Sequence, residues 1–241
     1  MKYFFVLMLA LGAAGIYSFR PGIVANDIVG AWGLKFEEKQ SVLIATDRGV
    51  FSVARYDVAG KKFLGSYGGT YKTEGNKIKQ MIEWHSLDSL KVGTVIEEEF
   101  TISNGKLGMK KTGSWDRLDD GKPGDLQGAW IITGTYKNDS VSKRANPFHP
   151  RRTMKLLSGK YFHWIAYNVA TKQFLNAGGG TYTTVKGKYT ENIEFFTKTA
   201  ESVGKTLAFD YSFVDGDWRH RGQKSTGGEM DECWTRRQNF E

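Results

Sequence analysis

Cysteine and proline are scarce in this sequence: among 241 residues there are four prolines and one cysteine, Cys233. A single thiol cannot form an internal disulfide, which excludes the cross-linked scaffolds common among small secreted domains. The apolar run at the N-terminus, about a dozen residues, is too short to span a bilayer comfortably. The folded part of the chain therefore has to be stabilised by its own hydrophobic core.

Patterns that carry catalysis are also missing. The four histidines lack metal-ligand spacing, there is no Gly-x-Ser-x-Gly motif, and no histidine partner for Cys233 is evident. The glycine runs at 68–69 and 178–180 lack the Gly-Lys-Ser/Thr ending of a phosphate-binding loop. The sequence predicts a protein that is not an enzyme, with no catalytic residue, no metal site and no cofactor.

The first 25 residues have the composition of a secretion signal. One basic residue, Lys2, precedes the apolar run, and small residues such as Ser18 and Ala25 follow it. No cysteine lies directly after the run, which argues against lipoprotein processing. We expect residues 1–25 to form a signal peptide and leader, which predicts a periplasmic or secreted protein. An uncleaved anchor is the alternative.

An internal repeat organises the rest of the chain. Residues 56–71 and 167–182 share ten of 16 residues, and the alignment runs without gaps from residues 48–107 against 159–218. The chain therefore contains two copies of one domain, expected at 26–121 and 122–241. Each copy is expected to fold alone, with residues 119–125 as a hinge.

Within each copy the hydrophobic pattern has a period of two. Short runs rich in Val, Ile, Thr, Tyr and Phe are separated by turns every eight to twelve residues, such as Asn-Gly at 104–105 and Asp-Gly at 215–216. About eight antiparallel strands fit into each copy, and a twisted sheet of that size tends to close on itself. The fold class predicted is all-β, with two tandem antiparallel barrels of about eight strands.

The ends of the copies resemble the lipocalin and fatty-acid-binding superfamily. Each opens with Gly-x-Trp, at Trp32 and Trp130, and closes with Trp-x-Arg, at Arg117 and Arg236. Copy two is also similar to an uncharacterised lipocalin-like domain family of secreted bacterial proteins, through Gly-Gly-Gly-Thr-Tyr at 178–182, residues 189–195, Val-Gly-Lys at 203–205 and Glu-Cys-Trp at 232–234. The resemblance implies barrels with an apolar interior, plugged by the tryptophans with the arginines stacked on them. It implies no established activity.

Candidate ligand-binding residues follow from the expected inward faces. They are Tyr71, Trp84, Glu98, Trp164, Tyr182, Phe195 and Phe209. The aromatic members could line a pocket or simply fill a small barrel. Glu98 falls on the inward phase where copy two has Phe209, so it is either a buried carboxylate or displaced by a β-bulge. Glu83 and Glu194 occupy matching positions and are expected to face solvent, with a ligand-binding acid as the alternative.

Positive charge is concentrated in copy two. Residues 26–125 contain 15 basic and 15 acidic side chains, whereas residues 126–241 contain 17 and 11. The connection 134–153 is about 13 residues longer than its counterpart in copy one and carries Arg144, His149, Arg151 and Arg152. We expect this basic loop to be a lid, a docking surface or a tolerated insertion. An anionic glycan or lipid head group is a more plausible partner for it than nucleic acid.

These observations predict a monomeric, secreted or periplasmic protein that binds a small apolar or amphipathic molecule inside a lipocalin-like barrel. The alternative is a non-enzymatic interaction module with filled barrels, which works through the basic surface and long loop of copy two. The presence or absence of a sizeable cavity distinguishes the two hypotheses.

Overall fold

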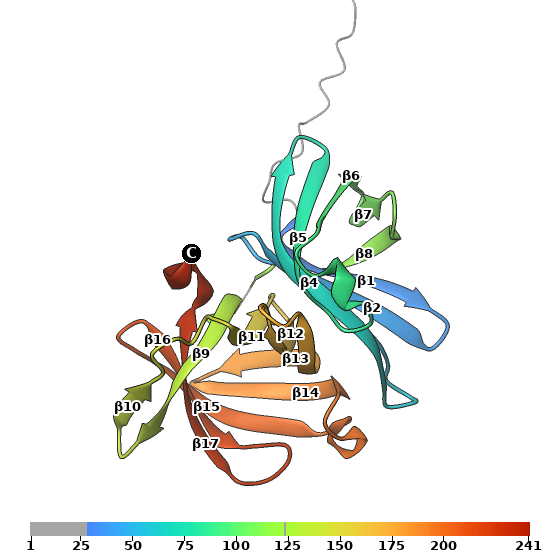
Figure 1. The fold of residues 1–241 in the computed structure, drawn as a ribbon. Helices are drawn as coiled ribbons and strands as arrows, with labels where there is room; N and C mark the ends of the chain where they lie inside the picture. The colour runs from blue at the N-terminus through green and yellow to red at the C-terminus, as the bar shows by residue number, and fades with distance from the viewer. Residues whose placement is uncertain (1–27, 123) are drawn as a thin grey trace, which may run out of the picture.

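The computed structural model describes residues 28–122 and 124–241, and the expected signal peptide lies outside them. Barrel 1 is a closed antiparallel sheet (Figure 1). Its strands are β1 (Gly30–Phe36), β2 (Lys39–Ala45), β3 (Val50–Asp57), β4 (Lys62–Glu74), β5 (Lys77–His85), β6 (Val95–Ser103), β7 (Lys106–Met109) and β8 (Gly113–Asp119). A short 3-10 helix, η2 (Ser89–Lys91), lies between β5 and β6.

Barrel 2 repeats this arrangement with one addition. Its strands are β9 (Gly128–Lys137), β10 (Ser140–Lys143), β11 (Arg151–Leu157), β12 (Tyr161–Asn168), β13 (Gln173–Val185), β14 (Lys188–Phe196), β15 (Thr206–Val214), β16 (Asp217–Gln223) and β17 (Glu229–Arg236), with 3-10 helices η3 (Ala200–Ser202) and η4 (Arg237–Phe240). Pairing of β9 with β17 closes the ring, and β10 pairs with the far end of β9 outside it. The predicted fold class, two tandem eight-stranded barrels, is confirmed.

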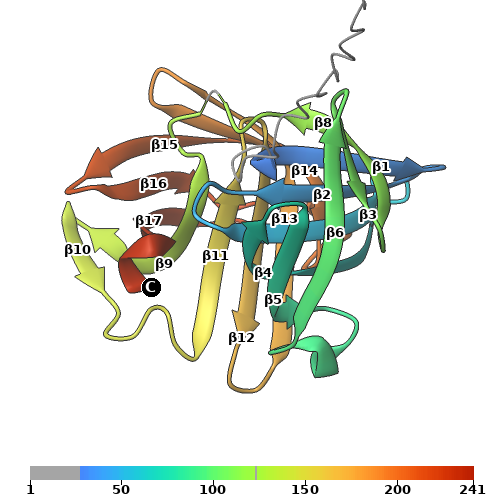
Figure 2. The same ribbon diagram turned by 90° about the horizontal axis from the view of Figure 1, so that it is seen from above.

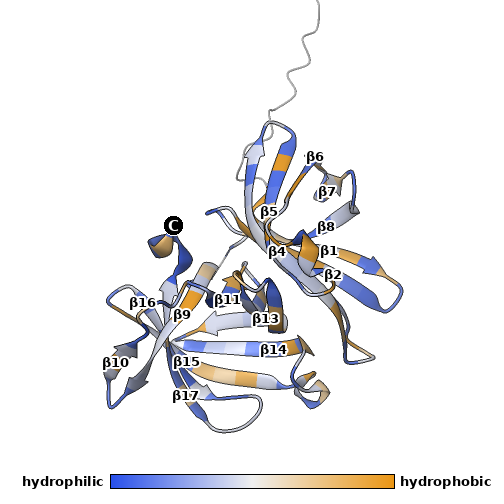
Figure 3. Cartoon of the chain, in the orientation of Figure 1, coloured by the Kyte–Doolittle hydropathy of each residue, from blue (hydrophilic) through white to orange (hydrophobic). Residues whose placement is uncertain are grey.

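Alternating side chains make each sheet two-faced, as the banded colouring of β5 illustrates (Figure 3). The glycine pairs allow the long strands to bend. A β-bulge lies between Gly68 and Gly69 in barrel 1 and between Gly179 and Gly180 in barrel 2. A Cβ atom on Gly69 would lie 2.0 Å from the Met81 carbonyl oxygen, so the neighbouring strand approaches closer there than a side chain would allow.

Matching tryptophans close the two barrels. Trp32 and Trp130 are buried, and each indole Nε1 donates to the carbonyl oxygen four residues earlier, of Ile28 or Leu126, at 2.8 Å. The guanidinium of Arg117 lies 4.0 Å from the centre of the Trp32 ring, and that of Arg236 lies 3.8 Å from Trp130. The structure thus shows the stacked closure that the resemblance implied.

The barrels pack against each other through β2–β5 and β11–β14 (Figure 2). The contacts follow an approximate two-fold symmetry: Tyr56 packs on Phe195 with ring centres 4.6 Å apart, and Trp84 packs on Tyr167 at 5.0 Å. Buried apolar residues of both copies form one continuous core there. A third hydrophobic core, shared between the barrels, therefore lies beside the two barrel interiors.

The connection between the copies is anchored on both sides by Asp119. Its carboxylate accepts hydrogen bonds from the backbone of Ala31 and Gly121 in copy one, and from Ser158, Gly159 and Lys160 in copy two. A connection held by five hydrogen bonds to both copies is not expected to move as a free hinge. Separating the copies would break these bonds and expose the shared core to water.

Among the described residues, no helix is both long and apolar enough to cross a membrane.

Candidate ligand-binding site

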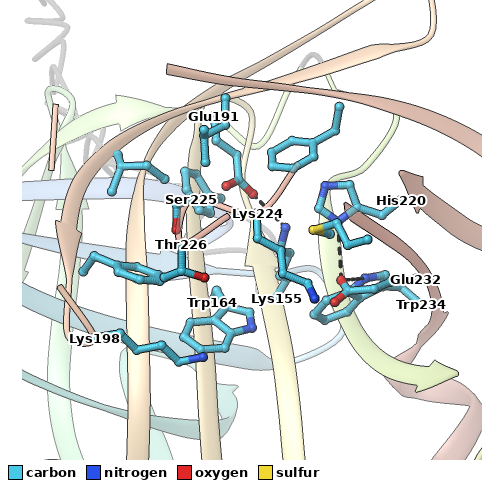
Figure 4. A pocket seen from close by; sticks show the side chains of 17 residues that line it. Lys155, Trp164, Glu191, Lys198, His220, Lys224, Ser225, Thr226, Glu232 and Trp234 are labelled. Atoms are coloured by element: carbon cyan, nitrogen blue, oxygen red, sulfur yellow. Dashed lines mark hydrogen bonds and ion pairs between the residues drawn. The ribbon is translucent and has the colours of Figure 1, made fainter. Parts of the chain in front are cut away.

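Barrel 2 contains a cavity of about 430 Å³ at the end opposite its tryptophan plug. This volume lies within the usual range of small-molecule sites, about 300–1,000 Å³. Its walls are mainly apolar, formed by Phe162, Trp164, Ile193, Phe196, Leu207, Phe209, Met230 and Trp234. Figure 4 shows the labelled polar side chains around the same space, from several strands and from the connections that follow β14 and β16.

A buried ion pair lies inside the cavity. Lys155 of β11 donates to Glu191 of β14 at 2.7 Å, and both residues are less than 10% exposed. The Lys155 ammonium is also surrounded by five aromatic rings, with centres 5.0–6.0 Å from Nζ (Phe162, Tyr189, Phe209, Trp218 and Trp234). The carboxylate and the ring faces together stabilise an ammonium that burial alone would disfavour.

A second polar pair, His220 and Glu232, faces the same space from neighbouring strands. His220 Nδ1 lies 3.7 Å from the Glu232 carboxylate, which also accepts a hydrogen bond from Trp234 Nε1 at 3.1 Å. Burial lowers the pKa of His220 to about 4, so the imidazole is neutral at pH 7. Burial would raise the pKa of Glu232, but His220, Lys155 and the Trp234 N–H outweigh it and lower that pKa, so the carboxyl is ionised.

Several buried polar atoms around this cluster lack hydrogen-bond partners among the described residues. They are Tyr189 Oη, Trp218 Nε1 and both ring nitrogens of His220. The three rings are adjacent, with centres 5.0–5.4 Å apart. Of the three residues, His220 is the one that lines the cavity. Because buried polar groups are nearly always satisfied by protein, water or ligand, its ring nitrogens have capacity for a polar guest.

The polar cluster is a property of barrel 2 alone. Strand pairing makes each position comparable: Lys155 pairs with Trp130 as Leu43 pairs with Trp32, and Glu191 pairs with Tyr182 as Gln80 pairs with Tyr71. By the same comparison, Met109 and Gly113 stand where barrel 2 has His220 and Glu232. Barrel 1 therefore has no ionisable group at any of these four positions.

Barrel 1 has a cavity of about 370 Å³ at its own open end, but its composition differs. Exposed cations, Lys39, Arg55 and Lys111, surround Tyr67 and Trp115 there. Tyr67 occupies the position of Gly178 in barrel 2, so a bulky ring stands where barrel 2 has no side chain. The deep interior of barrel 1 is packed mainly with apolar residues, with Gln80 and Glu98 buried beside them.

The structure divides the predicted ligand-binding residues into three groups. Trp164 and Phe209 line the cavity of barrel 2, whereas Tyr182 lies in that barrel's core and donates to the Ser158 carbonyl. Tyr71 lies in the core of barrel 1 and donates to the Thr46 carbonyl at 2.7 Å.

Glu98 also belongs to barrel 1, on a strand whose pairing is regular, so the alternative of a β-bulge is wrong. Glu98 is buried and accepts a hydrogen bond from the Lys111 backbone.

Trp84 and Phe195 were expected inside the barrels, and this expectation is wrong. The bulges place one extra residue, Glu83 or Glu194, between the paired positions. Each strand changes phase at that residue, so that Ile82 and Ile193 face inward while Trp84 and Phe195 turn outward into the shared core. They join the barrels and do not line the cavity.

The expectation that Glu83 and Glu194 face solvent is also wrong, because the opposite barrel covers them. Tyr56 donates to Glu194 at 2.6 Å, and Tyr167 donates to Glu83 at 2.7 Å. Arg237 forms a bidentate pair with Glu83, and Arg152 lies 2.9 Å from it. Burial would raise the pKa of Glu83, but the two arginines and Tyr167 outweigh it and lower that pKa.

The basic loop is partly committed to internal contacts. Arg152 is largely buried between Phe148 and Glu83, and Phe148 stacks on Phe240 near the C-terminus. Arg144, His149 and Arg151 are exposed. The loop does not line the cavity of barrel 2, so among the described residues it does not act as a lid. Its first part forms the hairpin β9–β10 instead.

Sequence reasoning missed Lys155, Glu191, His220 and Glu232. In β11 the apolar residues are Met154 and Leu156, which suggests that they face inward and Lys155 outward. The reverse holds, because Met154 and Leu156 belong to the shared core on the outer face. The available signal was the register to Trp130, which places Lys155 inside.

Comparisons with known proteins gave no match: no family model, no curated protein and no solved structure is detectably similar to this chain. Nor do the described residues contain a group of three or more His, Cys, Asp and Glu side chains suited to a metal ion.

Proposed function

We propose that this protein binds one small amphipathic molecule in the cavity of barrel 2, without catalysing a reaction. The observation that carries the proposal is the cavity itself: about 430 Å³, with largely aromatic and aliphatic walls and a small set of buried polar groups. Binding sites for small molecules characteristically combine a mostly apolar lining with a few placed polar groups. The lipocalin-like arrangement, a closed barrel with one plugged end, supports the same reading by analogy alone.

The proposal includes a periplasmic or secreted location, supported by the composition of residues 1–25. Fractionation of the host and N-terminal sequencing of the mature chain test that part. A mature chain beginning near residue 25 supports it, and an intact Met1 in the cytoplasmic fraction contradicts it.

Native mass spectrometry of the full chain purified from its host tests the binding. We expect one non-covalent adduct of small-molecule mass, lost in Leu207→Trp, which adds bulk to the cavity wall. Ile96→Trp, at the matching position of barrel 1, is the control and should keep the adduct. A wild-type chain without an adduct, which also fails to bind a panel of long-chain amphiphiles, contradicts the proposal.

A further inference from the structure

The charges along the cavity of barrel 2 are unevenly distributed. Inside lie one buried cation, Lys155, and two carboxylates, Glu191 and Glu232. Lys155 is bound to Glu191, so the negative charge of Glu232 is not matched by a cation in direct contact. Two exposed lysines, Lys198 and Lys224, also line the cavity. The cavity is thus negative at its inner end and positive at the end that meets solvent.

The inner end offers both donors and acceptors of hydrogen bonds. The Lys155 ammonium and the N–H of the neutral, unpartnered His220 ring are donors, while the Glu232 carboxylate supplies acceptors. A guest with a carboxylate there would lie beside the carboxylate of Glu232, whose side chain is 21% exposed, and the like charges would repel each other. A purely apolar guest would leave the buried groups unsatisfied.

We propose that the ligand of barrel 2 carries a neutral donor–acceptor group, such as a hydroxyl, at its inner end and an anionic group at its outer end, beside Lys198 and Lys224. This inference rests on the proposed function and names its ligand class: a chain-like amphiphile with a hydroxyl at one end and an acid at the other. The hydroxyl both donates to the Glu232 carboxylate and accepts from Lys155 or the His220 N–H.

Three twelve-carbon probes that differ at one end test this assignment: 12-hydroxydodecanoate, dodecanoate and dodecanedioate. Isothermal titration calorimetry at pH 7.5 on the full chain should give the tightest binding for the hydroxy acid, by about tenfold over dodecanoate, with the diacid weakest. Glu232→Gln removes the inner negative charge while keeping an acceptor, so it should strengthen diacid binding about tenfold and change hydroxy-acid binding much less.

The outer end is tested with Lys198→Gln/Lys224→Gln. This double variant should weaken binding of 12-hydroxydodecanoate and leave 1,12-dodecanediol unaffected. Equal affinity for the three probes, or tightest binding of the diacid, overturns the inference while leaving the proposed function intact. Failure of every probe to bind, together with the absence of an adduct in native mass spectra, overturns the proposed function.

Discussion

The two barrels share a scaffold and differ in what fills it. Both are closed by a buried tryptophan under an arginine, and both bend at a glycine bulge. At four matching interior positions, however, barrel 1 has Leu43, Gln80, Met109 and Gly113, and barrel 2 has Lys155, Glu191, His220 and Glu232. The fold therefore requires the tryptophan closure and the glycine bulge, whereas it does not require the ionisable residues at these four positions.

A buried ion pair is costly, so the Lys155–Glu191 pair of barrel 2 needs an explanation other than stability. Hydrophobic replacements of a buried ion pair are often neutral or stabilising. Barrel 1 is an example of such a replacement within the same chain, because its sheet closes with Leu43 and Gln80 at the positions of Lys155 and Glu191. This comparison favours a functional role for the polar cluster.

Breaking the ion pair should have the largest effect on stability. Lys155→Leu introduces the barrel 1 residue but leaves Glu191 buried without its partner, and we expect a loss of about 3–5 kcal/mol. The double variant Lys155→Leu/Glu191→Gln completes the exchange and should recover most of that loss. Urea unfolding measures both. If the double variant is as unstable as the single one, the barrels are not interchangeable at these positions.

The closures should behave alike in the two barrels. Trp130→Ala and Trp32→Ala each remove a fully buried indole and should each cost about 3–5 kcal/mol. Arg236→Ala and Arg117→Ala should each cost less, about 0.5–2 kcal/mol, the contribution of a cation–π contact. The same unfolding measurements apply. A near-zero cost for one tryptophan and a large cost for the other would show that the common scaffold is not equally important in both copies.

His220 should make barrel 2 sensitive to acid. Its folded pKa, about 4, is below the unfolded value of about 6.5, so the unfolded state binds the extra proton in this window. The contribution of neutral His220 to the free energy of unfolding should be fully present above pH 6.5. It should fall as the pH drops towards 4, by at most about 1.4 kcal/mol per pH unit. His220→Met, the residue of barrel 1, should flatten the slope. Parallel slopes for wild type and variant would contradict this.

The contacts between the barrels should show a smaller asymmetry. Tyr56→Phe leaves Glu194 with only Gln40 among its hydrogen-bond partners in the described chain, whereas Tyr167→Phe leaves Glu83 with two arginines. We expect Tyr56→Phe to cost about 1–2 kcal/mol and Tyr167→Phe less than about 1 kcal/mol. Thermal unfolding of the two variants compares them directly. The reverse order would mean that the arginines do not support Glu83.

Sequence patterns predicted the scaffold because its requirements are local. The period-two runs, the turn residues and the matching Trp32 and Trp130 each reflect a constraint within one copy. The packing of one copy on the other was not predictable in this way. It buries Trp84, Met154 and Leu156, which lie on the outer faces of their barrels. Lys155 lies on the inner face of barrel 2, which reverses the usual pattern of apolar residues inside and polar residues outside. The polar site was missed for this reason.

Hydrogen–deuterium exchange of the full chain, with and without 12-hydroxydodecanoate, tests the central claim most directly, because it locates ligand binding in one barrel or the other. The account predicts slower exchange on ligand addition in β14–β17 of barrel 2, whose side chains line the cavity, and unchanged exchange in the matching strands β5–β8 of barrel 1. Slower exchange confined to barrel 1, or equal in both barrels, would contradict it.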